Sequence, residues 1–255
     1  MRSALCGARI AFVVSPDYVP NSIRYHGFMR TVASCLGLLL LIGPTSPSTA
    51  ELPTLVQSAL ARGAGSAGGW GYTMSTVEYG VTTVERFDPD AADGGWTLVS
   101  VDGKPPSKKQ LKKYAAKSGT RESRDHPGEI DFADIVDPDS IALVAESTRS
   151  ATFRFKPAPD ESGDDDPTSA FLDGTLFVDK TGPFVDSLEL ANTDPFSAAT
   201  GVKIHRMRVR MEFVHDRRGR VVLSELSQSV EGRLFGMKSI NQASTVTYSE
   251  FARPD

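Results

Sequence analysis

Cysteine is nearly absent from this 255-residue chain, and its two copies, Cys6 and Cys35, both lie near the beginning. The residues from 51 onward therefore contain no thiol, which excludes a disulfide-stapled fold and a cysteine-ligated zinc site in that part. Histidine is also scarce, with three copies in residues 51–255 and no H-x-x-x-H spacing. We accordingly expect no metal centre and no cofactor.

Catalytic signatures are missing as well. The sequence has no G-x-S-x-G elbow, no P-loop, and no G-x-G-x-x-G motif on a strand-to-helix turn. We therefore predict a protein that is not an enzyme and has no catalytic residues. The less favoured alternative is a hydrolase without a recognised motif, with a cleft near His126 or His205.

Long hydrophobic runs are lacking, because the one sustained apolar run, Leu36–Gly43, is short. It cannot span a bilayer, which takes about 20 apolar residues. Met29-Arg30 opens a short basic region before it, and the small residues Ser48 and Ala50 follow it. A basic start, an apolar core and a small-residue exit are the three parts of a secretory signal peptide.

We therefore predict that residues 1–50 form a signal region that is cleaved after Ala50. Residues 1–28 do not share its pattern, so we interpret Met29 as the true start; an unusually long basic region is the alternative. The mature part, residues 51–255, is expected to be a single β-rich domain in the periplasm. No later segment is long and apolar enough to be an integral membrane span.

The mature part is acidic. The whole chain has 28 basic residues (Lys and Arg) and 32 acidic residues (Asp and Glu). Four of the basic residues and one of the acidic residues lie in 1–50. The net charge of residues 51–255 is therefore −7. Such a charge argues against nucleic acid as a partner. An acidic run at 160–166 is interpreted as a solvated loop rather than a calcium site.

Alternation of apolar and polar residues dominates the second half of the chain. The clearest case is 202–214, where Met207, Val209, Met211 and Phe213 alternate with Arg206, Arg208, Arg210 and Glu212. This period of two predicts antiparallel strands with one apolar face. Expected strands are 70–78, 81–87, 96–101, 152–156, 171–179, 184–190, 202–214, 220–235 and 238–251. Residues 132–144 are mixed, and we expect a short helix followed by a strand there.

Helices are few. The apolar spacing of residues 51–62 and the S-x-x-Q capping pair Ser107/Gln110 predict helices over 51–62 and 107–117. The fold class is therefore α+β. The expected architecture is a curved antiparallel β-sheet, a half-open barrel, with two or three helices on its concave face.

An apolar concavity is the candidate ligand site of this sheet, because methionine and aromatic side chains suit a lipid or acyl chain. The predicted lining is Trp70, Phe177, Leu188, Leu190, Met207, Met211, Phe213 and Leu226. A filled core beneath the helices is the alternative. The row Arg206, Arg208 and Arg210 is the candidate polar rim, or else forms cross-strand pairs with acids such as Glu225 and Glu231.

Two segments resemble a known family. Residues 174–182 followed by 184–190 form a strand, a turn at Thr181-Gly182 and a second strand. This element and the closing strand 245–251 are similar to those of the periplasmic lipoprotein-carrier (LolA-like) superfamily. Residues 96–114, with the opening W-x-L-x-x-x-D-G, are similar to uncharacterised proteobacterial envelope proteins.

The resemblance implies an unclosed barrel that holds acyl chains beneath helices. We therefore predict a non-catalytic periplasmic binding or carrier protein whose partner is a lipid, an acyl chain or a lipoprotein. The alternative is an envelope interaction or scaffold protein without a ligand pocket.

Overall fold

The computed structural model describes most of the chain beyond residue 53, in the ranges 54–62, 70–91, 95–118, 130–158, 168–217 and 219–252. All of these residues belong to one structural unit. The predicted signal region 1–50, the acidic run 160–166 and His126 lie outside the described residues.

Strands make up most of the described chain, as predicted. The helices are α1 (Thr54–Arg62) and α2 (Lys108–Ser118), with short 3₁₀ helices at Phe132–Asp134, Pro138–Ser140 and Ser169–Phe171. The strands are β1 (Gly71–Glu78), β2 (Val81–Phe87), β3 (Trp96–Val101), β4 (Ala142–Glu146), β5 (Ser150–Phe155), β6 (Leu172–Asp179), β7 (Phe184–Asn192), β8 (Phe196–Ala199), β9 (Val202–His215), β10 (Val221–Leu234) and β11 (Lys238–Ala252).

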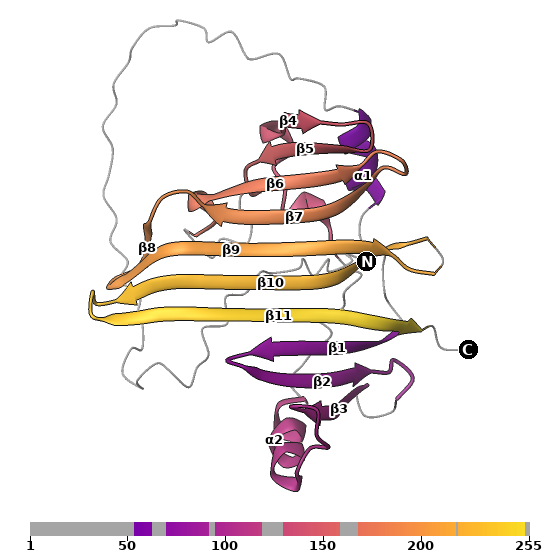
Figure 1. Ribbon diagram of the computed structural model, residues 1–255, viewed down its shortest axis with the longest axis vertical. Helices are drawn as coiled ribbons and strands as arrows, with labels where there is room; N and C mark the ends of the chain where they lie inside the picture. The colour runs from indigo at the N-terminus through magenta and orange to yellow at the C-terminus, as the bar shows by residue number, and fades with distance from the viewer. Residues whose placement is uncertain are drawn as a thin grey trace, which may run out of the picture. The chain divides into compact units, whose positions relative to one another are not determined.

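The strands form one antiparallel sheet in the order β3-β2-β1-β11-β10-β9-β7-β6-β5-β4, with β8 paired to the start of β9 (Figure 1). The edge strands β3 and β4 do not pair with each other, so the sheet is not closed into a barrel. A simple meander was expected, and the chain follows one from β4 to β11. The difference is that β1 pairs with the far side of β11, which attaches the first three strands there.

Local sequence explains the turns and helix ends. Tyr79 and Gly80 connect β1 to β2 with φ angles of 50° and 75°, which a two-residue hairpin of the primed type requires. At α2, the backbone N–H of Ser107 donates to Oε1 of Gln110 at 2.8 Å, so the predicted capping pair is present. Helix α2 contacts the edge strand β3, whereas α1 contacts β7.

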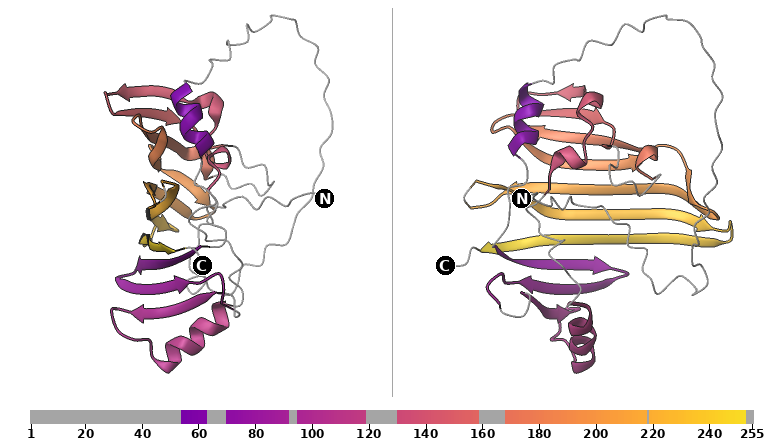
Figure 2. Two further views of the ribbon diagram at one scale, coloured as in Figure 1. Left: turned by 90° about the vertical axis from the view of Figure 1, so that its right-hand side faces the viewer. Right: turned by 180° about the vertical axis from the view of Figure 1, so that it is seen from behind.

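The apolar face of the sheet carries two packed clusters. In the first, α1 buries Val56 and Ala59, and the ring of Phe132 contacts that of Phe213 at 5.2 Å between centroids. Figure 2 shows α1 lying across the strands at the β4–β7 end of the sheet. These contacts follow from the alternation of β9, because Met207, Val209, Met211 and Phe213 all project to this face and are buried.

The second cluster is aromatic and lies on β1, β2, β3 and β11. Tyr72 is fully buried at its centre, with ring centroids 5.3 Å from Phe87, 5.7 Å from Trp96 and 5.9 Å from Tyr248. The pairs with Trp96 and Tyr248 are edge-to-face, and aromatic pairs of this kind add about 0.5–1.5 kcal/mol each beyond the area they bury. This cluster explains why β1 pairs with the open edge of β11.

Candidate functional site

The predicted apolar concavity is largely filled. Five of its eight side chains are at most 4% exposed, namely Leu188, Leu190, Met207, Met211 and Phe213. The register of the sheet places Leu188 opposite Met211, and elements on the same side, including α1, complete the packing. A ligand would reach these side chains only if a covering element moved, so their part in binding stays a prediction.

Phe177 does not belong with that group, which corrects the sequence interpretation. It lies opposite Thr152 on β5 and Ser187 on β7, on the polar face of the sheet. The reason is that Leu176, Phe177 and Val178 are consecutive apolar residues, so alternation alone does not say which of them faces the core. The register with the neighbouring strands decides, and Leu176 and Val178 are the buried ones.

Trp70 and Leu226 are also separated from the buried five. Trp70 precedes β1, and the guanidinium carbon of Arg220 lies 3.4 Å from its ring centroid, in a cation–π contact. Arg220 in turn donates to Oδ2 of Asp216 at 2.7 Å. Leu226 faces the same side as Met211 but is only half-buried. The structure therefore does not gather the eight predicted side chains into one concavity.

The arginine row of β9 is engaged by carboxylates of the protein itself, so the cross-strand interpretation is confirmed. The closest pairs are Arg206 with Glu231 at 3.4 Å, Arg208 with Glu189 at 3.2 Å, and Arg210 with Glu212 at 2.9 Å and Glu189 at 3.5 Å. Glu225, the other predicted partner, is in none of these pairs. Cations that are already neutralised in this way are poorly suited to bind an external anion.

Two pKa shifts belong to this polar face. Glu212 accepts a hydrogen bond from Arg210, which raises the pKa of that guanidinium further above its ordinary value. Partial burial raises the pKa of Asp186, and the nearby charges of Asp179 and Glu212 raise it further. The three arginines of this face are already paired with carboxylates, and Asp186 adds a further acidic group. An anionic ligand is therefore not expected at this part of the sheet.

A different cluster of cations lines a groove at the end of the sheet where β8 ends, β9 begins and β10 ends. This cationic groove has a volume of about 510 Å³ and is lined by Ser197, Gly201, Val202, Lys203, His205, Arg233, Phe235 and Gly236. Its size falls within the range of small-molecule sites, about 300–1,000 Å³. Figure 1 shows β8 and the β10–β11 turn together at this end.

Lys203 and Arg233 are the central charges of the cationic groove. They lie directly opposite each other on β9 and β10, on the same face. Within the described residues neither forms an ion pair, and the guanidinium of Arg233 reaches only the backbone oxygen of Gly236, at 3.4 Å. Like charges in this arrangement destabilise a sheet. An anionic ligand would offset the repulsion and supply the missing partner.

A β-bulge creates this pair. The register between β9 and β10 shifts between Glu231 and Gly232, and His205 is the extra residue on β9. Regular alternation would turn Lys203 toward the apolar face, with Met207. Gly232 is needed at this point because a Cβ there would lie 2.4 Å from the backbone oxygen of Lys203. Bulges often re-aim side chains beside functional sites.

Phe235 forms the apolar wall of the cationic groove. Its φ of 50° is unusual for a non-glycine residue, and its backbone N–H donates to the carbonyl of Gly201. The ring lies so close over Gly201 that a Cβ there would be 2.3 Å from it. The groove therefore combines two cations with a fixed aromatic surface, which suits an anion that carries an apolar portion.

The sequence does contain a signal for this site, and that signal is independent of strand periodicity. Residues 196–205 and 232–240 contain no acidic residue, although the chain as a whole has more acids than bases. A local lack of acids in two segments that become neighbours leaves Lys203 and Arg233 without an ion-pair partner among the residues that the structure describes. The pairing itself depends on the bulge, which strand periodicity does not reveal.

Other possible sites are weaker. A second groove of about 310 Å³ beside the β1–β2 turn is lined by Val77, Tyr79, Gly80, Asn241, Ala243, Ser244 and Thr245, none of which is charged. Among the described residues, no group of three or more histidine, cysteine or acidic side chains is placed to hold a metal ion. His205 and His215 lie near opposite ends of β9.

Comparison with known proteins adds no further assignment, because no family model and no curated protein matches this chain. No helix in the described part of the chain is long and apolar enough to cross a membrane.

Proposed function

We propose that this chain is an exported, non-catalytic protein that binds or carries an anionic amphiphile, such as a lipid or an acyl chain with a charged head. The observation that supports the proposal most directly is the Lys203–Arg233 pair, which has no ion-pair partner among the described residues and lies beside the aromatic ring of Phe235. The likeness to periplasmic lipoprotein carriers and the expected concave apolar face under helices belong to this proposal and point to the same class of ligand.

Different residues of the cationic groove would contact the two parts of the ligand. Lys203 and Arg233 would contact the charged head, and charge-assisted hydrogen bonds of this kind are about twice as strong as neutral ones. The hydroxyl of Ser197 lies on the groove lining and can donate to the same head. Phe235 and Val202 would contact the first carbons of the chain.

Isothermal titration calorimetry with monomeric decyl phosphate tests the proposal. The wild-type protein should bind decyl phosphate more tightly than inorganic phosphate or decanol, because each of those lacks half of the recognised chemistry. The double variant K203Q/R233Q should lose at least about tenfold in affinity, since two charge-assisted contacts disappear.

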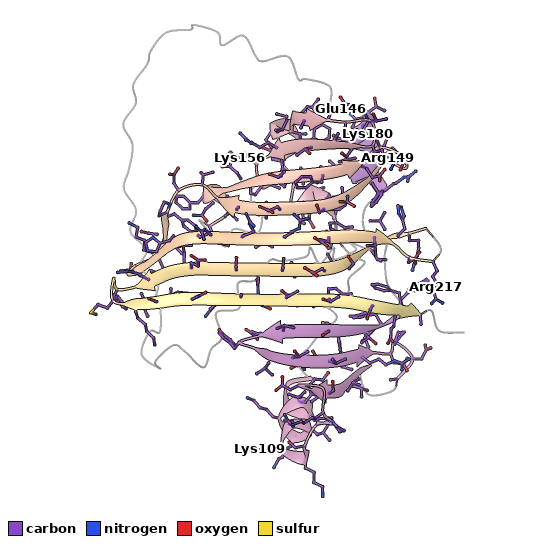
Figure 3. The ribbon with its side chains drawn as sticks, viewed as in Figure 1. Lys109, Glu146, Arg149, Lys156, Lys180 and Arg217 are labelled. Atoms are coloured by element: carbon purple, nitrogen blue, oxygen red, sulfur yellow. The ribbon has the colours of Figure 1, made fainter. Side chains whose placement is uncertain are left out.

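The matched control is K109Q/R149Q, which removes one lysine and one arginine elsewhere. Lys109 lies on α2 and Arg149 lies at the β4–β5 turn, both away from the cationic groove (Figure 3). This control should bind like the wild type. The proposal fails if wild-type protein does not bind decyl phosphate, or if both double variants lose affinity equally.

A partner-binding role is the second candidate, and it has its own observation. All five residues of the edge strand β4 are exposed, including Leu143 and Val144. An unpaired edge of this kind is a template for strand addition by another chain. Replacing Val144 with proline should abolish capture of such a partner and leave decyl phosphate binding unchanged.

A further inference from the structure

The turn between β10 and β11 exposes apolar side chains to an unusual degree. Met237 is 86% exposed and Phe235 is 61% exposed, the two highest values among the large apolar side chains that the structure describes. Single exposed apolar side chains are common on proteins, whereas neighbouring ones form the contiguous patches that are found at interaction sites.

The turn holds a defined conformation. The backbone N–H of Phe235 donates to the carbonyl of Gly201, and that of Met237 donates to the carbonyl of Leu234 at 3.2 Å. Gly236 supplies the positive φ, 70°, that the turn requires. Met237 therefore extends outward from a turn of defined backbone conformation between β10 and β11.

We propose that this turn docks on an anionic lipid surface, with Met237 and Phe235 entering the interface. The inference rests on the proposed function only in its choice of lipid as the ligand class. Charge complementarity supports it: Lys203 and Arg233 have no ion-pair partner among the described residues, and no acidic residue lies in 196–205 or 232–240. Apolar side chains with adjacent cations are the composition that interfacial segments use.

The position of the cationic groove connects docking of this turn with ligand binding. Phe235 belongs both to the turn and to the wall of the groove. Docking would therefore place the groove at the level of the lipid head groups, where an anionic amphiphile enters or leaves. A convex turn with one side chain almost fully exposed fits a lipid surface better than an acidic protein partner, which would need complementary concave surface.

Vesicle co-sedimentation of residues 51–255, the predicted mature part, tests the proposal. Vesicles of phosphatidylglycerol and phosphatidylcholine in equal parts should bind the protein, whereas vesicles of phosphatidylcholine alone should bind it weakly. Removing Lys203 or Arg233 should reduce binding about fivefold for each charge lost. High salt should have a similar effect, since it screens the attraction.

Met237→Ser is the decisive variant, because its side chain makes no core contact and the fold should be unaffected. It should weaken vesicle binding severalfold and leave decyl phosphate binding in solution unchanged. Leu143→Ser, which removes an exposed apolar side chain on β4, is the control and should bind vesicles like the wild type.

The outcomes separate this inference from the proposed function. Vesicle binding that is equal in wild type and Met237→Ser, or absent in the wild type, overturns the docking proposal, and the exposed pair would then belong to a protein interface. Vesicle binding lost in Met237→Ser but no binding of decyl phosphate would support the docking turn and refute the groove as a ligand site.

Discussion

Lys203→Glu should stabilise the protein while it abolishes ligand binding. Lys203 lies directly opposite Arg233, so its replacement by an acid turns a repulsive pair into an attractive one. Two unit charges about 6 Å apart in water interact by about 0.7 kcal/mol. Removing the repulsion and adding an attraction of similar size gives about 1 kcal/mol at low salt, after screening and side-chain entropy are considered.

Urea unfolding followed by circular dichroism measures this gain. At about 10 mM salt the free energy of unfolding of Lys203→Glu should exceed that of wild type by about 1 kcal/mol, and Tm should rise by about 2–4 °C. At about 1 M salt most of the difference should vanish, because the screening length falls to about 3 Å.

Arg206→Glu is the matched control, because Arg206 lies on the same strand but is paired with Glu231. It should be destabilised at low salt, as it creates a like-charge pair. The reasoning would be refuted if Lys203→Glu were less stable than wild type at low salt, or if its gain did not depend on salt. A stabilising change that removes binding is what a functional site predicts.

The remaining predictions concern packing, backbone and charge. Leu188→Ala, at a fully buried site, should lower the free energy of unfolding by about 2–5 kcal/mol in urea titrations; a loss below about 1 kcal/mol would mean that the apolar face is not tightly filled there. Gly232→Ala should weaken decyl phosphate binding, because its Cβ displaces the Lys203 backbone; unchanged affinity would show that the bulge does not position the groove. Asp186→Asn should stabilise the protein near pH 7 and have no effect near pH 3. Its raised pKa means that ionisation destabilises the folded state as pH rises above the unfolded value of about 3.9, so a gain that persists at about pH 3 would contradict this cause.

The strands were well predicted because their signal is local. Alternation in 202–214 identified β9, and the expected ranges 81–87 and 96–101 agree with the bounds of β2 and β3. The short strand β8 was missed, since Phe196–Ala199 contains too few alternating residues to stand out. The pairing of β1 with β11 was also missed, because it depends on the distant aromatic contact of Tyr72 with Tyr248.

The candidate site was predicted less well, for a physical reason. Arg206, Arg208 and Arg210 were chosen because they stand out in the sequence, but whether a cation is free depends on its cross-strand neighbours. The register of the sheet places Glu231 and Glu189 beside these arginines, whereas the bulge at His205 places Lys203 opposite Arg233. Surface ion pairs elsewhere, such as Lys180 with Glu146 at 2.6 Å (Figure 3), likewise follow from strand pairing.

The most direct test of the groove as the ligand site is nuclear magnetic resonance mapping of backbone amides during titration with decyl phosphate. The account predicts the largest shifts at Ser197, Gly201, Lys203 and residues 233–236. Shifts concentrated instead at Leu188 and Met211, beneath α1, would place the ligand in the apolar core and contradict it.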